Sequence, residues 1–357
     1  NPMSLRLNNF KVRYFIMIIS LANCAAIDPS EVSNLGNTTS LQWINNIGTA
    51  TDVETGTAKL QFIGAGGFHL AFSTGSVLVD PFYSNPGLLA IATLGSLAPD
   101  TETIDRHLPP LDDVKAVLVG HAHYDHVLDI PYIATKLAPN ARIYGNLTLK
   151  NILNATLESS QVINVEPSMS IDGAGGRWLT ISRNMRVFPI KSNHAPQLGS
   201  WQLAAGNIEH PQRQLPRDAI DWRSGENVSY LLDLLDNNGA TIYRIFIQTS
   251  ASSFPNGLPP DSILNDGKPV DMAVLCAASY QKMERYPEYL LEQMAPQNVV
   301  LVHWEKFWSP YEPGQATPLP GLDIERLYQR INTVIPHAKV SILQRGAVMK
   351  WSLGPND

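Results

Sequence analysis

The most constraining feature of this chain is the run Gly120-His121-Ala122-His123-Tyr124-Asp125-His126, which directly follows a short apolar stretch. That stretch, residues 115–119, predicts a buried strand because only its first residue is charged. Imidazole and carboxylate are ligands that zinc and iron favour. On a tight strand-to-helix turn, the first two histidines of the run converge on one ion, and the aspartate and the third histidine face a second position. The sequence therefore predicts a metal site at this strand end, rather than a chance cluster of solvated side chains.

Length, charge and cysteine content narrow the class of protein. A chain of 357 residues with 44% hydrophobic residues can bury one large core or two medium ones. Its formal net charge is −6, and no cluster of lysine and arginine occurs in it. Binding to a phosphate backbone needs a concentrated basic face, so nucleic acid is not expected as a partner. Two cysteines, Cys24 and Cys276, are too few for a disulfide framework.

Strands and helices alternate over residues 58–353, which predicts a single α/β domain. The pattern has two halves, 58–190 and 191–353, with no linker between them. Residues 27–57 are rich in polar residues and predict a linker or N-terminal extension with one short helix near 41–47. Strands are predicted at 59–64, 76–80, 115–119, 186–190, 241–248, 272–276, 298–302 and 339–343, and helices at 130–137, 286–294 and 324–335.

Residues 1–26 have the pattern of an export signal. Three basic residues precede the apolar stretch 14–22, which is too short to cross a membrane by itself. The segment Leu21-Ala22-Asn23-Cys24 resembles a lipobox, whose cysteine becomes lipidated, although Asn23 departs from the residue types that the motif favours. We therefore expect export to a bacterial envelope, as a lipoprotein or a periplasmic protein. The alternatives for this segment are a cleaved signal without lipid and a retained structural element.

Residues 82–111 interrupt the alternation with a proline-bounded insertion whose centre is apolar. Insertions of that length inside a compact domain are usually functional or mobile. We expect Leu88, Leu89 and Leu94 to contact an apolar part of a substrate or a membrane surface, because a loop cannot easily bury a contiguous apolar patch by itself. The alternatives are a short helix that completes the core and a contact between two copies of the chain.

The histidine-rich run resembles the signature of the metallo-β-lactamase superfamily, and the resemblance extends over about residues 58–350. It implies an α/β (α+β) fold, the four-layer αββα sandwich, in which two sheets pack face to face with helices outside. The implied cofactor is Zn²⁺, as one or two ions, with Fe or Mn as alternatives. The implied ligands are His121, His123 and His194 at the first metal position, and Asp125, His126 and His303 at the second.

Two further positions follow from the same resemblance. Asp80 matches the early aspartate of the family, which supports the ligand turn without binding metal itself. The second position is a departure, because the family normally has a bridging aspartate after the strand between its last two histidines, where this chain has Thr249. A neutral hydroxyl replaces a bridging carboxylate poorly. Either one metal position is weakened, or another group fills in, or the residue was changed to trap a ligand.

Within the superfamily, the chain is most similar to the branch that contains N-acylphosphatidylethanolamine phospholipase D and L-ascorbate-6-phosphate lactonase. The similar strings are residues 108–111, 270–275 and 303–307. This resemblance implies a metal-dependent hydrolase of a phosphodiester, with a small or phospholipid-like substrate, in which Asp125 is catalytic and steers the attacking water. A lactone or carboxylic ester is the alternative substrate. Thr249 supports a third hypothesis, a non-catalytic envelope protein that binds a metal or a lipid. The sequence does not indicate an oligomeric state.

Overall fold

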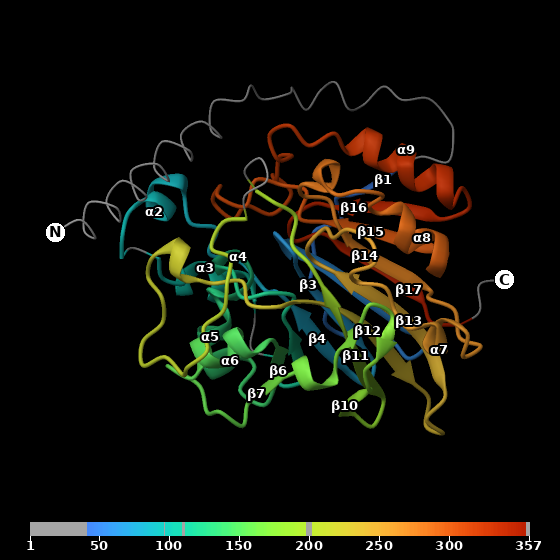
Figure 1. Ribbon diagram of the computed structural model, residues 1–357, viewed down its shortest axis with the longest axis horizontal. Coiled ribbons are helices and arrows are strands. Elements are labelled where there is room, and N and C mark those ends of the chain that lie inside the picture. The colour runs from blue at the N-terminus through green and yellow to red at the C-terminus, as the bar shows by residue number, and fades with distance from the viewer. Residues whose placement is uncertain (1–40, 96, 109–110, 198–201, 355–357) are drawn as a thin grey trace.

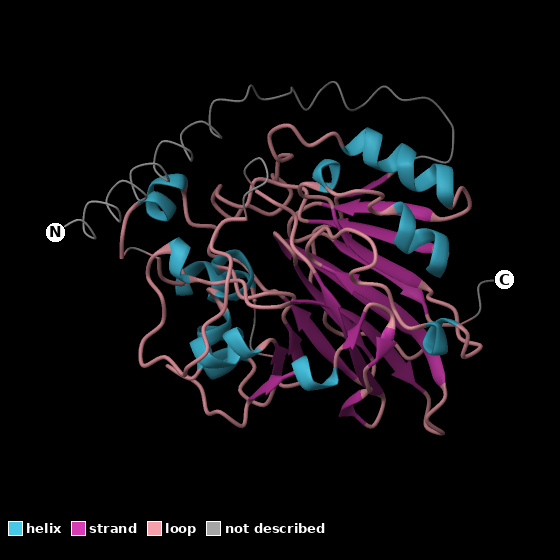
Figure 2. Cartoon of the chain, in the orientation of Figure 1, coloured by secondary structure: helices cyan, strands magenta, loops and turns pink. Residues whose placement is uncertain are grey.

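The fold is built on two β-sheets with helices on their outer sides (Figure 1). The computed structural model describes residues 41–95, 97–108, 111–197 and 202–354. The predicted export signal, residues 1–26, lies outside the described residues. Figure 2 shows the strands gathered in the centre of the molecule and the helices around them. This mixed α/β arrangement confirms the predicted four-layer sandwich.

Seven strands within the described residues make the first sheet. Its β2, β3 and β4 form an antiparallel meander, and the strands from β4 to β7 run parallel. Because β4 and β5 are parallel neighbours, Asp80 and the histidine-rich run, which follow them, leave the sheet at the same edge. In spatial order the strands are β17 (Val348–Ser352), β2 (Thr57–Gly64), β3 (Gly67–Phe72), β4 (Gly75–Val79), β5 (Val114–Leu118), β6 (Arg142–Gly145) and β7 (Val162–Asn164).

Ten strands within the described residues make the second sheet. The four strands from β13 to β16 run parallel, so Thr249 and His303, which follow β13 and β15, also leave from a common edge. In spatial order the strands are β1 (Gln42–Ile44), β16 (Lys339–Leu343), β15 (Asn298–Val302), β14 (Met272–Cys276), β13 (Thr241–Gln248), β12 (Asn227–Leu235), β11 (Met185–Ser192), β8 (Ser170–Ile171) and β9 (Ala174–Gly175), and β10 (Leu179–Ser182) pairs with β11.

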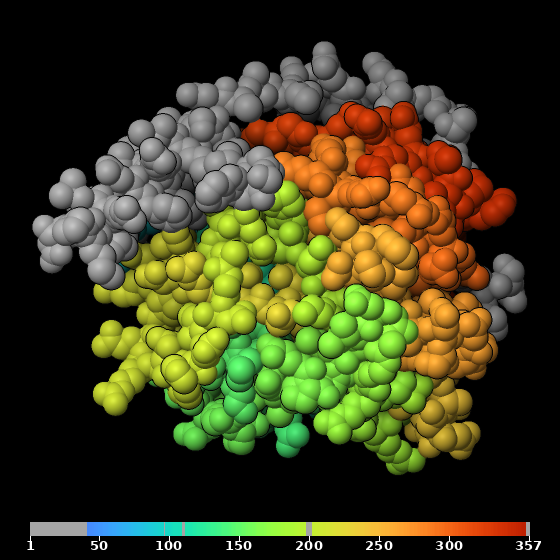
Figure 3. All heavy atoms as spheres, viewed as in Figure 1, coloured from blue at the N-terminus to red at the C-terminus, as the bar shows by residue number. Residues whose placement is uncertain are grey.

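A large apolar core holds the two sheets together. Side chains alternate along β2, so Leu60 and Phe62 join this core while Ile63 joins the second core, under the helices of the first sheet. The other sheet contributes Val187 from β11 and Ile245 from β13. Each fully buried side chain of this size stabilises the fold by about 1.5–3 kcal/mol relative to exposure. Figure 3 shows the green-to-yellow middle of the chain packed directly beside its orange-to-red C-terminal part.

Short helices complete the outer layers. The C-terminal helix α9 shows why a helix forms there, because Asp323 accepts a hydrogen bond from Arg326 N at its start, and Leu327 and Ile331 lie on one buried face. No helix of the described part of the chain is long and apolar enough to cross a membrane. The helices are α2 (Leu88–Ala92), α3 (Thr101–His107), α4 (Tyr124–Val127), α5 (Ile130–Tyr132), η2 (Ile133–Leu137), α6 (Leu147–Leu153), η3 (Glu166–Ser168), η4 (Ala219–Asp221), α7 (Asp261–Leu264), η5 (Tyr280–Lys282), α8 (Glu288–Met294) and α9 (Ile324–Val334).

The structure corrects one sequence-based prediction and adds strand pairings that were not predicted. The helix predicted near 41–47 is the strand β1, which adds to the edge of the second sheet beside β16, so part of the predicted linker belongs to the fold. The strands β2 to β7 of the first sheet follow one another along the chain. In addition β17 returns to pair with β2. The strand β12 was also missed.

The insertion at 82–111 is ordered into α2, α3 and a buried anchor. Asp129 is fully buried, and its carboxylate accepts hydrogen bonds from Tyr83 N at 2.6 Å and Ser84 N at 2.9 Å. Burial raises the pKa of Asp129 to about 6. Ile91 and Leu97 pack into the core, whereas Leu89 is 75% exposed and Leu94 is 57% exposed. The short helix that was one of the alternative predictions is therefore present as α2. Leu89 and Leu94 nevertheless remain exposed to solvent.

Candidate metal centre

The turn that carries the histidine-rich run is fixed by backbone contacts with both sheets. Val119 N donates to Tyr144 O of β6, and Gly120 O accepts from Val228 N of β12. Glycine is required at position 120, because a Cβ there would lie 2.2 Å from Thr249 Oγ1 and 3.3 Å from Asp80 Oδ2. The absence of a side chain lets the end of β5 approach the end of β13.

Six side chains converge at the edge where these strand ends meet. They form two groups, and within each group the candidate ligand atoms all lie within 4.8 Å of one another. The two groups adjoin, since the rings of His121 and His126 are 4.0 Å apart between centroids. The first group is His121, His123 and His194, and the second is Asp125, His126 and His303, the same sets that the resemblance implied.

Distances within the groups are short. His121 Nε2 and His123 Nδ1 are 2.9 Å apart, and the ring of His194 lies 4.6 Å from that of His121. In the second group, Asp125 Oδ2 is 3.3 Å from His303 Nε2 and 3.6 Å from His126 Nε2. An ion placed between such atoms would need little movement of the side chains to be bound.

Asp80 contacts both the turn and one of the candidate ligands, as expected for a residue that supports the ligands. Its Oδ1 accepts from Gly120 N at 2.9 Å, and its Oδ2 lies 2.7 Å from His126 Nδ1. With Nδ1 engaged, the Nε2 of His126 is left to face the second group. A carboxylate behind a histidine ligand orients the ring and increases its basicity.

Burial and neighbouring charges set the protonation of the ligands. Burial lowers the pKa of His123 to about 4 and, with the charge of His123 as the second cause, the pKa of His194 to about 3. Burial, followed by the nearby histidines, also places the pKa of His121 well below its usual range. These imidazoles are neutral at pH 7, so their lone pairs are available.

In the second group, burial and the neighbouring charges shift the pKa values in opposite directions. Burial by itself would raise the pKa of Asp125, but the charge of His126 and the hydrogen bond from His303 outweigh burial and hold the pKa below its usual range. Burial would lower the pKa of His126, but Asp80 and Asp125 raise it above the ordinary value. An ionised carboxylate beside histidines is a suitable ligand set for a divalent cation.

An unpaired nitrogen in the second group and the chemistry of the donors show that the residues fit a metal. His126 Nε2 lies 3.6 Å from Asp125 Oδ2, is buried and has no hydrogen-bond partner. Buried polar atoms without partners are rare, because each costs about 1–3 kcal/mol. Imidazole and carboxylate donors without thiolate suit Zn²⁺, Fe and Mn. The residues therefore fit one ion in each group.

Thr249 lies beside this centre, directly after β13. Thr249 and His126 both lie against Gly66. A Cβ on Gly66 would be 2.8 Å from Thr249 Cβ and 2.9 Å from His126 Cε1. Thr249 is 2% exposed, and its Oγ1 is buried without a hydrogen-bond partner. A neutral hydroxyl thus stands at the strand end where the resemblance places a bridging carboxylate.

A buried ion pair behind His303 was not predicted from the sequence. Glu305 Oε1 accepts from Ala65 N at 2.8 Å, and Ala65 O accepts from His303 N at 2.7 Å. Arg345 Nη2 lies 3.3 Å from the same Glu305 oxygen. This chain of contacts holds His303 in a left-handed conformation, with φ of 56°. Only the charged residues in otherwise apolar surroundings could have indicated this pair.

The remaining histidines lie away from the centre. His69 is buried in β3, consistent with a structural role, and burial lowers its pKa to about 4. His210 and His337 are exposed. His107 is half-buried, and its ring packs against Tyr311.

Comparison with known proteins agrees with the geometry of this centre. Residues 76–304 match the family model described as the beta-lactamase superfamily domain, so the chain belongs to that superfamily. A comparison with curated protein sequences gives no match.

Solved structures are similar to this chain at low sequence identity. The metallo hydrolase Igni18 from Ignicoccus hospitalis is 14% identical, with a TM-score of 0.51, and the similarity covers 83% of this chain and 99% of that one. YhfI from Bacillus subtilis is 15% identical, with a TM-score of 0.46 over 83% of this chain and 100% of its own. An isothiocyanate hydrolase from Delia radicum gut bacteria is 14% identical, with a TM-score of 0.45 over 82% of this chain and 99% of its own.

Replacing His121 by alanine is expected to reduce metal affinity by more than about tenfold, because the first group loses one of its three donors. Metal content per chain is measured by mass spectrometry after dialysis, with circular dichroism to verify folding. The matched control is His337→Ala, which removes an exposed histidine. Full metal occupancy in His121→Ala would contradict the assignment.

Thr249→Asp is expected to raise occupancy at the second group, because an added anion offsets the repulsion between two cations. The control is Thr249→Asn, because asparagine has nearly the same shape as aspartate but carries no charge. Metal content of both variants is measured at equal free metal. Equal occupancy in the two variants would show that residue 249 does not face the ions.

Proposed function

We propose that this protein is a metal-dependent hydrolase that cleaves a phosphodiester. The observation that carries the proposal is the pair of adjoining ligand groups, three neutral histidines beside an aspartate with two histidines. When bound, divalent ions supply Lewis-acid polarisation of the scissile group and acidify water. The preference for a phosphodiester rests on the resemblance to the branch that contains N-acylphosphatidylethanolamine phospholipase D.

Asp125 is the proposed catalytic residue among the ligands. Its carboxylate is ionised at neutral pH, because His126 and His303 hold its pKa below the usual range. Asp125 Oδ1 can therefore accept a hydrogen bond from the attacking water while Oδ2 faces His303. Asp80 keeps His126 oriented, and the contact from Ala65 to His303 fixes the opposite side of the site.

Two other functions remain alternatives, each with a distinct signature. A lactone or carboxylic ester needs the same polarising centre, so the ligand geometry is compatible with it as well. A non-catalytic envelope protein that binds a metal or a lipid is favoured by Thr249, which places a neutral group at the position of the bridging carboxylate. Metal content and turnover, measured together, separate these alternatives.

The metal-loaded protein is expected to hydrolyse bis-p-nitrophenyl phosphate, to lose activity after chelation and to regain it with Zn²⁺, Mn²⁺ or Fe²⁺. Asp125→Asn is expected to lower kcat by about 100-fold or more, as loss of a group that positions the attacking water does. Hydrolysis of p-nitrophenyl acetate or a lactone alone would favour the ester alternative. Full metal content without any turnover would favour the binding protein.

We also propose that α2 contacts an apolar part of the substrate or a membrane surface. Leu89 of α2 and Leu94, which follows it, are both more than half exposed, and exposed apolar side chains on one segment often mark an interaction site. The predicted export to a bacterial envelope would place this patch near acyl chains. Dimerisation through the same patch is the competing explanation.

The double variant Leu89→Ser/Leu94→Ser is expected to lower kcat/KM several-fold on a long-chain phosphodiester, because transfer of an acyl chain from water is weakened. Activity on a short-chain phosphodiester and the melting temperature should hold. The control is Ile171→Ser/Ile242→Ser, which removes exposed apolar side chains elsewhere. A change of mass in solution instead of substrate preference would identify a dimer contact.

A further inference from the structure

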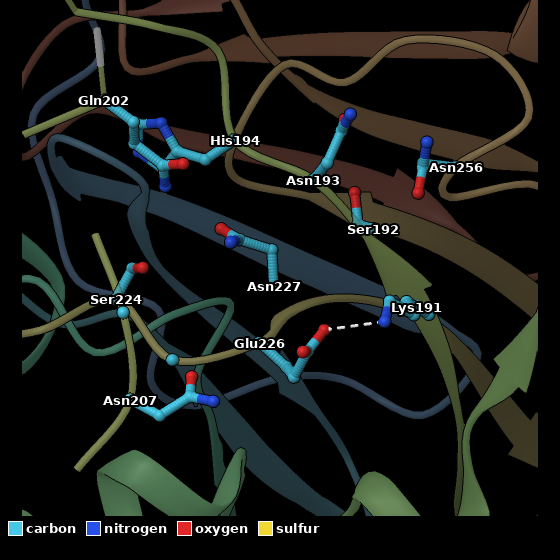
Figure 4. A pocket seen from close by; sticks show the side chains of 12 residues that line it. Lys191, Ser192, Asn193, His194, Gln202, Asn207, Ser224, Glu226, Asn227 and Asn256 are labelled. Atoms are coloured by element: carbon cyan, nitrogen blue, oxygen red, sulfur yellow. Dashed lines mark ion pairs between the residues drawn. The ribbon is translucent and has the colours of Figure 1, made fainter.

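A cavity of about 400 Å³ opens beside His194, on the side of the first ligand group (Figure 4). Its lining comes from the end of β11, the segment before β12 and the start of β12, with Asn256 on the far side. Four asparagines and one glutamine are among the lining residues. Apart from the imidazole of His194, no aromatic ring and no large aliphatic side chain belongs to the described lining. The wall is thus composed of hydrogen-bonding groups.

Charges in this wall cancel. Lys191 Nζ and Glu226 Oε2 form an ion pair at 3.0 Å, drawn as the dashed line in Figure 4. Besides this ion pair and His194, the lining consists of serine, asparagine, glutamine and glycine, which carry no charge. A wall without net charge attracts neither an ammonium nor a second anion strongly.

Asn227 supplies an unmet hydrogen bond to the cavity. It is the first residue of β12, it is 7% exposed, and it lies between His194 and the ion pair in Figure 4. Its Oδ1 is buried and has no partner within the described part of the protein. A buried carbonyl oxygen without a donor is costly, so a ligand that brings an O–H or N–H there gains affinity.

From these observations we infer that the cavity binds a neutral, hydroxylated part of the substrate, whose O–H donates to Asn227 Oδ1. The inference rests on the proposed phosphodiester hydrolysis and names the group on one side of the scissile phosphate. An acyl chain would leave the amides of the wall unpaired, and a quaternary ammonium would lack the aromatic faces that bind it. Asn227 therefore selects for a substrate with a hydroxylated alcohol component.

The test compares two phosphodiesters with the same leaving group, glyceryl 4-nitrophenyl phosphate and propyl 4-nitrophenyl phosphate. They differ only in two hydroxyl groups. The metal-loaded wild-type protein is expected to show about tenfold higher kcat/KM for the glyceryl compound, because a site built for a hydroxyl rejects the analogue that lacks it. Asn227→Ala is expected to reduce this ratio to about 2 or less. Asn238→Ala, at an exposed turn, is the matched control and should retain the ratio.

Binding is measured separately by calorimetry with glyceryl phosphate and propyl phosphate. Equal kcat/KM for the two phosphodiesters in the wild-type protein would overturn the inference and leave the proposed function standing. No turnover of either compound, together with tighter binding of glyceryl phosphate that depends on Asn227, would reject phosphodiester hydrolysis and support the cavity assignment. Equal binding of the two phosphates without turnover would reject both. The wild-type comparison decides the inference even if Asn227→Ala does not fold.

Discussion

The carboxylate of Asp80 is the contact on which the geometry of the centre depends. It receives the amide of Gly120 with one oxygen and faces His126 with the other, so one side chain at the end of β4 fixes both the turn after β5 and a ligand carried by that turn. Asp80 is completely buried, and an unpaired carboxylate there would be expensive to bury. The contacts with Gly120 and His126 keep the buried carboxylate paired, and the same contacts hold the turn in place. His303 is held in an equivalent way by the backbone of Ala65 and the ion pair behind it.

Local sequence pattern was sufficient for the elements that this centre rests on. The strands 241–248, 272–276, 298–302 and 339–343 were predicted with their observed bounds, because each is an apolar run bounded by polar residues. The six candidate ligands were predicted because their residue types and order match a known family, and the structure brings them together in two groups.

Contacts between residues that are distant in sequence could not be predicted from local sequence pattern. Residues 42–44 look like part of a polar linker, and only the open edge of β16 makes them a strand. The partnership of Glu305 and Arg345 depends on the fold of residues 40 apart in sequence. The cavity near Asn227 is assembled from several segments, and none of them has a motif. Such features follow from packing of the whole domain, which periodicity does not encode.

The pairing of β17 with β2 has a consequence for biosynthesis. The first sheet carries Asp80 and the histidine-rich run at the ends of β4 and β5, yet one of its edges is closed by residues 348–352. During synthesis on the ribosome, β2 emerges long before its partner, and its free edge stays available for pairing with other chains. The edge strand β1 likewise has no partner until β16 has been synthesised. Contacts this distant in sequence slow folding, so these two strand edges stay open for longer than edges closed by a neighbouring hairpin.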